Sequence, residues 1–159
     1  MTQKDKELLL KDLCARLPYG VKIHLETPKY GKLIGTLDAL YPTEERVIVD
    51  NLDKAIAPIN VRCGGFLIER DDVKPYLRPM SSMTEEEKEE FHKIKQFSVT
   101  VIMSNGVSIF KPTYTVDLED DGDGLNYLYD WLNSHYFDYR GLIEKGLALE
   151  ASEGMYNIK

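Results

Sequence analysis

The most restrictive feature of this sequence is a change in the spacing of its apolar residues at Val21. Between residues 3 and 17, leucines recur every three or four positions, as on one face of an amphipathic helix. From Val21 onward, apolar and polar residues alternate, which is the spacing of a strand with one buried face. Pro18 and Gly20 lie between the two patterns, where they end the helix and permit a turn. The chain is therefore predicted to place a helix directly before a sheet.

Short strands follow as far as about residue 70. Lys32–Tyr41 and Arg46–Asp50 have the composition of strands, and Gly35 marks a bulge or bend in the first of them. Ala55–Arg62 is a weaker strand because it contains a proline, and Gly65–Glu69 is either a strand or a short helical turn. No helical pattern separates these segments, which favours a small antiparallel barrel or sandwich over an α/β sheet. We expect an SH3-like barrel over residues 20–70.

The next part of the chain predicts an extended connector, a helix and a hairpin. Val73–Met80 contains two prolines four residues apart, which disfavour both a helix and a strand ladder. Thr84 and Glu87 have the spacing of a capping box at the start of a glutamate-rich helix. Phe97–Met103 and Val107–Lys111 flank an Asn-Gly pair, which is typical of a tight β-hairpin.

An acidic stretch at residues 117–124 separates a possible strand, Thr113–Leu118, from a last helix that ends at Ser134. In one register, from Glu119 to Asp130, the acids have the spacing of a calcium-binding loop. Its first and last ligands are of the wrong type, and a strand precedes it where a helix is expected. Whether this turn binds a cation is left open. The tail at 135–151 is too aromatic and apolar for a disordered segment, so we expect it to pack on the body of the protein.

Charge is distributed unevenly along the chain. Residues 1–80 hold 13 Lys and Arg against 12 Asp and Glu, whereas residues 81–159 hold 7 against 15. The acidic second half disfavours binding to phosphate backbones, and no polybasic patch or long apolar run points to a membrane. Cys14 and Cys63 do not have the spacing of a metal site or of a disulfide framework. We expect two reduced thiols, both small buried side chains, in a cytoplasmic protein.

Three blocks of the chain resemble a group of uncharacterised proteins of gut bacteria and their phages or prophages. They are LLLKDLCARLPYGVK (Leu8–Lys22), VKPYLRPMSSMTEEE (Val73–Glu87) and LNSHYFDYRGLIEKGLALEA (Leu132–Ala151). Residues 95–124 are less similar to the common pattern, as a hairpin inserted between shared blocks would be. The resemblance implies an origin in a mobile element and a cytoplasmic setting, and it brings no activity, cofactor or catalytic residue.

The sequence contains no local pattern for catalysis, cofactor binding or metal binding. His24, His92 and His135 are far apart along the chain, and no HxxxH, HxH or CxxH spacing occurs. The nucleophile elbow, the phosphate-binding loop and the dinucleotide fingerprint are also missing from the sequence. We therefore predict no catalytic, cofactor or metal residue, and the sequence favours a noncatalytic protein over an enzyme whose site is assembled by the fold.

The candidate interaction residues are concentrated near the C-terminus. They are Trp131, Tyr136, Asp138, Tyr139 and Arg140, since aromatic and arginine side chains are enriched at interfaces. Asp138 and Arg140 form a charged pair within an apolar segment, where burial requires partners. A salt bridge that fixes the tail to the body is favoured, and an arginine that anchors a ligand is the alternative.

The sequence thus predicts one α+β domain over residues 1–159. An N-terminal helix and the SH3-like barrel form residues 1–80, and helices with an inserted hairpin at 97–118 form residues 81–159. We expect a noncatalytic cytoplasmic interaction or assembly protein of phage or prophage type, whose partner is a protein. The alternatives are a nucleic-acid-binding module that uses Lys22, Lys29, Lys32 and Arg46 on the barrel, and an enzyme.

Overall fold

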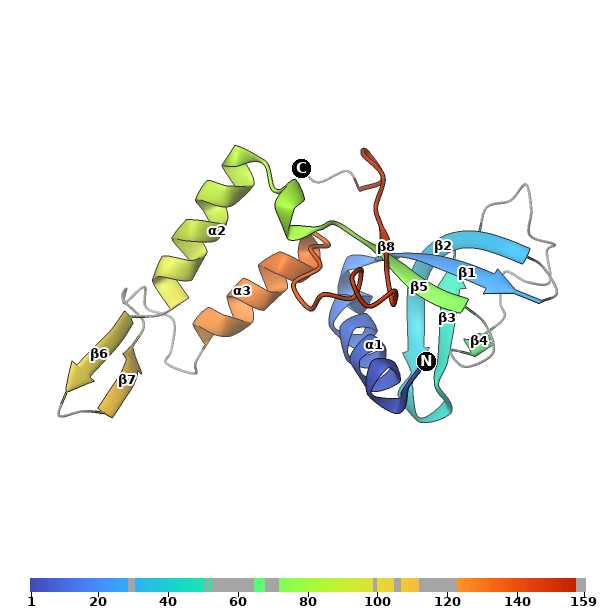
Figure 1. Ribbon diagram of the computed structural model, residues 1–159, viewed down its shortest axis with the longest axis horizontal. Helices are drawn as coiled ribbons and strands as arrows, with labels where there is room; N and C mark the ends of the chain where they lie inside the picture. Colours follow the sequence, from blue (N-terminus) through green and yellow to red (C-terminus); the bar gives the residue numbers. More distant parts are fainter. Residues whose placement is uncertain are drawn as a thin grey trace. The chain divides into compact units, whose positions relative to one another are not determined.

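The computed structural model describes residues 1–28, 31–50, 52, 65–67, 72–98, 100–104, 107–111 and 123–156. The chain forms two compact units. Unit 1 combines residues 1–79 with residues 133–159, and unit 2 consists of residues 80–132. Unit 1 contains a helix and a mostly antiparallel sheet, and unit 2 contains helical residues and a hairpin (Figure 1), so the predicted α+β class is confirmed.

Helix α1 (Gln3–Arg16) begins where the sequence predicts it and starts with a capping box. The Asp5 amide donates to Thr2 Oγ1 at 3.2 Å, and the Thr2 amide donates to the Asp5 carboxylate at 3.1 Å. After α1, a short 3₁₀ turn (Leu17–Tyr19) leads to Gly20, whose φ of 66° places it in the left-handed region. The predicted turn between helix and sheet is confirmed.

The buried face of α1 differs from the predicted stripe. Leu9 and Leu13 are buried as expected, but Cys14 is exposed, so its prediction as a buried side chain is wrong. The helix instead turns three charged side chains inward, which are Lys6, Asp12 and Arg16. These charges can be buried because they find partners in the fold. The spacing of the leucines alone does not predict those partners.

The sheet of unit 1 has the strand order β4-β3-β2-β1-β5-β8. Its strands are β1 (Lys22–Thr27), β2 (Gly31–Tyr41), β3 (Arg46–Asp50), β4 (Gly65–Leu67), β5 (Asp72–Leu77) and β8 (Leu149–Glu150). All neighbours pair antiparallel except β5 and β8, which are parallel. The turn between β2 and β3 is a 3₁₀ turn (Pro42–Glu44). The described strands do not close into a ring, so the SH3-like barrel is not confirmed.

Strand β2 changes its partner halfway along its length. Residues 31–36 pair with β1, and residues 36–41 pair with β3 through a register shift between Leu37 and Ala39. The irregularity expected near Gly35 therefore lies two residues further on. Gly35 is required for a different reason, because a Cβ there would overlap Val49 and lie 2.7 Å from the Asp50 carbonyl oxygen.

One face of the sheet, α1 and the C-terminal segment enclose the core of unit 1. Alternate residues of β1, which include Ile23 and Leu25, are fully buried, as the period of two predicts. The core continues through Leu142, Leu147 and Ala148, so the predicted packing of the tail is confirmed. Each large apolar side chain buried in this way contributes about 1.5–3 kcal/mol before the entropic cost.

Strand β5 occupies the segment predicted to be an extended connector, and that prediction is wrong. Pro75 lies opposite Ile23 of β1, although proline cannot donate to a ladder. On its other side β5 pairs with β8 only at Tyr76 and Leu77. Among the described strands, Pro75 therefore has a partner on one side only, which is a position where a sheet tolerates proline.

Unit 2 contains α2 (Glu85–Ser98), the hairpin of β6 (Thr100–Ser104) and β7 (Val107–Lys111), and most of α3 (Asp123–Ser134). A 3₁₀ turn (Met80–Ser82) precedes α2. The capping box is confirmed, because the Glu87 amide donates to Thr84 Oγ1 at 3.2 Å and the Thr84 amide to the Glu87 carboxylate at 2.9 Å. The hairpin is confirmed as well, with its first strand beginning at Thr100 because α2 extends to Ser98.

Several predictions concern residues that lie outside the described part of the chain. They are the weak strand at Ala55–Arg62, the strand at Thr113–Leu118, most of the acidic turn at 117–124, and the positions of Lys29 and Cys63. The segment at Gly65–Glu69 is described at Gly65–Leu67, where it forms a strand.

Candidate functional site

The segment that follows α3 contains four of the five candidate residues, and it is joined to the end of β5. The Arg78 amide donates to the Tyr136 carbonyl at 2.8 Å, and the Asp138 amide donates to the Arg78 carbonyl at 2.7 Å. These two hydrogen bonds form a parallel bridge between Arg78 and Phe137. Phe137 is fully buried, with the Arg78 guanidinium 4.4 Å from the centre of its ring. The bridge fixes the start of the segment.

Asp138 closes a turn within the segment. Its two carboxylate oxygens accept hydrogen bonds from the Leu142 and Ile143 amides, both at 2.8 Å. Gly141 lies inside this turn with a φ of 67°, a conformation that favours glycine. Asp138 is buried, and its charge is stabilised by amide donors rather than by a neighbouring arginine. The structured contact predicted for Asp138 is therefore this pair of hydrogen bonds, which caps the next turn of the segment.

Arg140 reaches across to α1. Its Nη1 donates to Asp12 at 3.1 Å, between residues 128 positions apart in sequence. The second oxygen of Asp12 accepts from Arg16 Nε at 2.7 Å, and Arg16 Nη2 donates to the Phe137 carbonyl at 2.8 Å. Asp12 and Arg16 are both fully buried. We call Asp12, Arg16 and Arg140 the ionic cluster.

Tyr139 lies beside both arginines of the ionic cluster. The guanidinium carbons are 5.6 Å from the centre of its ring for Arg16 and 4.8 Å for Arg140, within the range of a cation–π contact. The Tyr139 hydroxyl donates to the Asn133 side chain at 3.1 Å. Burial raises the pKa of Tyr139, and the two guanidinium groups oppose that increase. The phenol therefore remains neutral beside two cations at physiological pH.

Asp12 and Arg16 did not stand out in the sequence, although both are central to this cluster. Their only local signal is a spacing of four residues on the same side of α1 as Leu9 and Leu13. Their partners are supplied by a segment more than 120 residues away in sequence. A buried carboxylate between two guanidinium groups is suited to holding the C-terminal segment on α1, and its removal would leave the buried Arg16 without a counter-charge.

Tyr136 pairs with Tyr156 at the other side of the same segment. The two rings are stacked, with centres 3.6 Å apart and planes inclined by 9°. The Tyr136 hydroxyl donates to the Tyr19 carbonyl at 2.7 Å. The Tyr156 hydroxyl accepts from the Lys22 amide at 3.0 Å and donates to the Tyr76 carbonyl at 2.7 Å, so it connects β1 with β5. Burial strongly raises the pKa of Tyr156.

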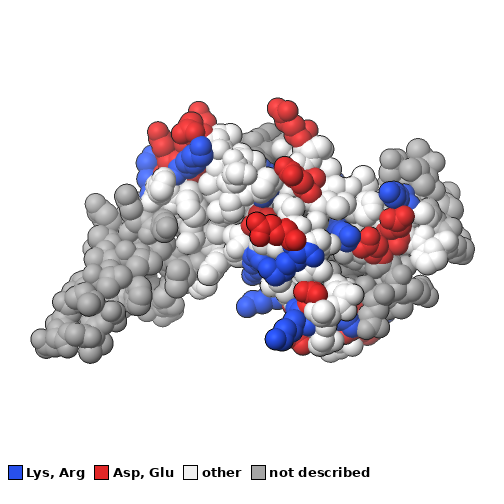
Figure 2. Space-filling model, in the orientation of Figure 1, with Lys and Arg blue, Asp and Glu red and all other residues white. Residues whose placement is uncertain are grey.

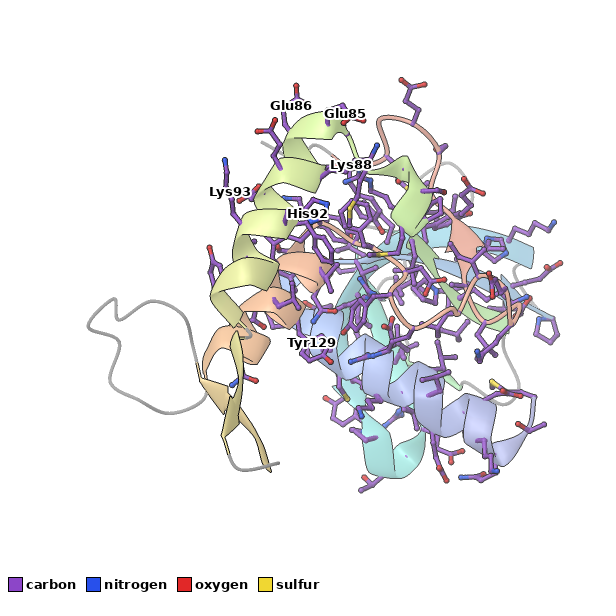
Figure 3. All side chains as sticks on the ribbon, turned by 60° about the vertical axis from the view of Figure 1, so that its left-hand side comes forward. Glu85, Glu86, Lys88, His92, Lys93 and Tyr129 are labelled. Carbon is purple, nitrogen blue, oxygen red and sulfur yellow. The ribbon has the colours of Figure 1, made fainter. Side chains whose placement is uncertain are left out.

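Trp131 belongs to unit 2, where it is buried and its ring centre lies 5.8 Å from that of Phe91. The exposed aromatic residues of α3 are instead Tyr127 and Tyr129, which are 62% and 46% accessible. The exposed side of α2 is rich in charge, and Figure 3 shows Glu85, Glu86, Lys88, His92 and Lys93 along it, with Tyr129 on α3. Unit 2 therefore combines surface acids with surface tyrosines.

Three of the four basic residues proposed for nucleic-acid binding are described, and each has an acidic or hydroxyl-bearing neighbour. Lys22 donates to Thr36, Lys32 lies opposite Glu26 in the β1–β2 register, and Arg46 pairs with Glu44. On the face drawn in Figure 2, the described basic and acidic side chains are interspersed. Arg46 is therefore paired with an acid, Lys32 has an acid opposite it in the register, and Lys22 has a hydroxyl partner.

The remaining titratable residues can be assigned to a metal or nucleophile site only where the structure describes them. Within the ranges that the structure describes, no group of three His, Cys, Asp or Glu could hold a metal ion. Partial burial raises the pKa of the exposed Cys14 thiol, which disfavours the reactive thiolate. The described helices include none with the length and apolar character needed to cross a membrane.

Comparison of the chain with protein-family models, with curated proteins and with solved structures finds no match.

Proposed function

We propose that this chain is a noncatalytic interaction or assembly protein of phage or prophage type, which acts in the cytoplasm by binding another protein. The observation that carries the proposal is the division of charge between the two units. Unit 1 holds 16 Lys and Arg and 16 Asp and Glu, whereas unit 2 holds 4 against 11. The entire net charge of −7 therefore belongs to unit 2. In this proposal, unit 1 is the scaffold and unit 2 makes the contact.

The chemistry of unit 2 indicates what kind of partner it would bind. Glu86, Glu89 and Glu90 are exposed on α2, and Tyr127 and Tyr129 are exposed on α3. A field of one sign accelerates encounter with a partner of opposite charge, and tyrosines supply contact area at low entropic cost. These features support a partner that presents lysine and arginine side chains. In unit 1, by contrast, the residues of the ionic cluster are engaged within the chain.

Nucleic-acid binding remains the second candidate, and the charge distribution opposes it. The acidic unit repels phosphates, and the lysines on the sheet have acidic or polar neighbours. We expect the chain to bind duplex DNA no more tightly than ~10⁻⁴ M at physiological salt. A gel shift at submicromolar protein that weakens steeply with added salt would favour this second candidate.

We also propose that the strands of unit 1 belong to a small SH3-like barrel. The support is the four-strand meander from β1 to β4, after which β5 returns to pair with β1, and the sharing of β2, which pairs with β1 through one half and with β3 through the other. A long strand shared in this way is how a small sheet curves toward closure. Backbone NOEs between β5 and residues 53–64 in a solution structure would support closure, and pairing of those residues elsewhere would contradict it.

The proposed function can be tested by comparing two multiple variants, in each of which three exposed glutamates are replaced by glutamine. One set changes unit 2 (E86Q, E89Q and E90Q, with Y127A and Y129A), and the control set changes three exposed acids of unit 1 (E7Q, E144Q and E153Q). Both are used as bait in the native host, with crosslinking and quantitative mass spectrometry. We expect the wild type and the control to retain one basic partner that the unit 2 set loses. Equal recovery by both sets, or no specific partner, would contradict the proposal.

A further inference from the structure

Unit 2 is an insertion in unit 1, and the two points where the chain leaves and re-enters unit 1 are bonded to each other. The chain leaves after Pro79 and returns at Asn133. Just outside these positions, Arg78 exchanges two backbone hydrogen bonds with Tyr136 and Asp138, at 2.8 and 2.7 Å. The two segments are thus paired like neighbouring strands, which lie about 4.8 Å apart. We call Arg78 with residues 135–138 the stem.

Side chains reinforce the stem on the unit 1 side. The ring of Phe137 is fully buried, the Arg78 guanidinium lies over it, and the ring of His135 is nearly parallel to it at 6.4 Å. Arg78 Nη1 also reaches the His135 carbonyl at 3.5 Å. Beyond the bridge, Asp138 holds the Leu142 and Ile143 amides. All these contacts lie within unit 1.

We infer that the stem insulates unit 1 from unit 2, so that unit 2 can open or rearrange when it engages a partner while unit 1 keeps its fold. The stem contacts named above all join residues of unit 1, and the entropic cost of closing a flexible loop grows only slowly with its length. Opening of unit 2 therefore leaves the stem intact. The inference concerns the folding of the chain itself, and only its use during partner binding rests on the proposed function.

Native-state hydrogen exchange of the full chain at increasing urea tests this insulation. We expect the α2 amides to exchange through an opening that leaves the amides of β1, Asp138 and Leu142 protected, as separate cooperative units do. R78A should lower the protection of the Asp138 and Leu142 amides at least 10-fold while leaving that of α2 unchanged. K74A, which removes a half-buried basic side chain of β5 that pairs with Asp72, serves as the matched control and should change all of these values less than 3-fold.

Two results would overturn the inference. In the first, the α2 and β1 amides of the wild type share one exchange isotherm at every urea concentration, which means that the units open together. In the second, R78A and K74A have the same effect on Asp138 and Leu142. If R78A does not fold, R78M is measured in its place, because it keeps an apolar chain over Phe137 and removes only the guanidinium. No partner is needed for this measurement, so its outcome is independent of the binding experiment.

Discussion

The first helices of unit 1 and unit 2 begin in the same way and then use charge in opposite ways. Both α1 and α2 start with a threonine capping box. Helix α1 then turns Lys6, Asp12 and Arg16 inward, whereas most of the charged residues of α2 are exposed. Three of the charged residues of α1 are therefore internal connectors, whereas those of α2 mostly form a surface. The comparison teaches that the count of charged residues on a helix says little about where those residues lie.

Removal of the C-terminal segment should have the largest effect, and it should affect unit 1. A chain that ends at Ser134 loses the buried side chains of Phe137, Leu142 and Leu147, at about 1.5–3 kcal/mol each, and leaves Asp12 without Arg140. We expect a loss of several kcal/mol, comparable with the whole stability of such a domain, and aggregation. Circular dichroism during urea unfolding measures it. A truncated chain that stays soluble and melts at the same temperature would show that the segment is an independent arm.

Removal of one charge from the ionic cluster should cost nearly as much. D12A leaves Arg16 buried without its carboxylate, so we expect the free energy of unfolding to fall by about 3–5 kcal/mol. The double variant D12L/R16M replaces the pair with apolar side chains and should lose much less. Urea unfolding of both variants gives the comparison. If D12A is as stable as the wild type, the cluster does not hold the segment on α1.

Alkaline pH should destabilise unit 1 through Tyr156. Burial raises its folded-state pKa above the unfolded value of about 10, so the folded state keeps the phenolic proton to higher pH. This contribution is fully present below pH 10 and is lost as pH rises further, by at most ~1.4 kcal/mol per pH unit. Unfolding between pH 9 and 11 should therefore show a smaller slope in Y156F than in the wild type. Identical slopes would contradict a buried phenol at this position.

The smallest effects should separate the two units most cleanly. T2A and T84A remove equivalent caps, at about 1 kcal/mol each. The loss should appear in unit 1 for T2A and in unit 2 for T84A. Trp131 is the only tryptophan of the chain and lies in unit 2, so its fluorescence can follow that unit while amide exchange of β1 follows the other. Equal shifts of both signals in both variants would mean that the two units unfold as one.

Local patterns were sufficient to predict the elements whose causes are local. The period of two in β1, the Arg46–Asp50 strand, the Thr84 cap and the hairpin all depend on residues close together in sequence. Strand β5 was not predictable in this way, because its proline is tolerated only at a position where β8 does not extend along the strand. That information is supplied by Leu149, more than 70 residues later.

The candidate site shows the same limit more clearly. The sequence singled out Asp138 and Arg140 as charges that need partners, and the structure places both in specific contacts. It could not identify Asp12 and Arg16, because a charged pair on an amphipathic helix is ordinarily at the surface. The prediction that Cys14 is buried was wrong for a related reason. The buried side of α1 depends on the distant C-terminal segment, which the local pattern does not include.

The discontinuity of unit 1 also sets an order of events during translation. Residues 80–132 leave the ribosome before the segment that completes unit 1, and at roughly 5–20 residues per second their synthesis takes about 3–10 s. Throughout that time Asp12 and Arg16 are without Arg140 and the Phe137 carbonyl, and β5 is without β8. Residues 1–79 therefore remain an incomplete unit until residues 133–159 have been made, so α1 is synthesised early in its unit but gains its full set of partners last.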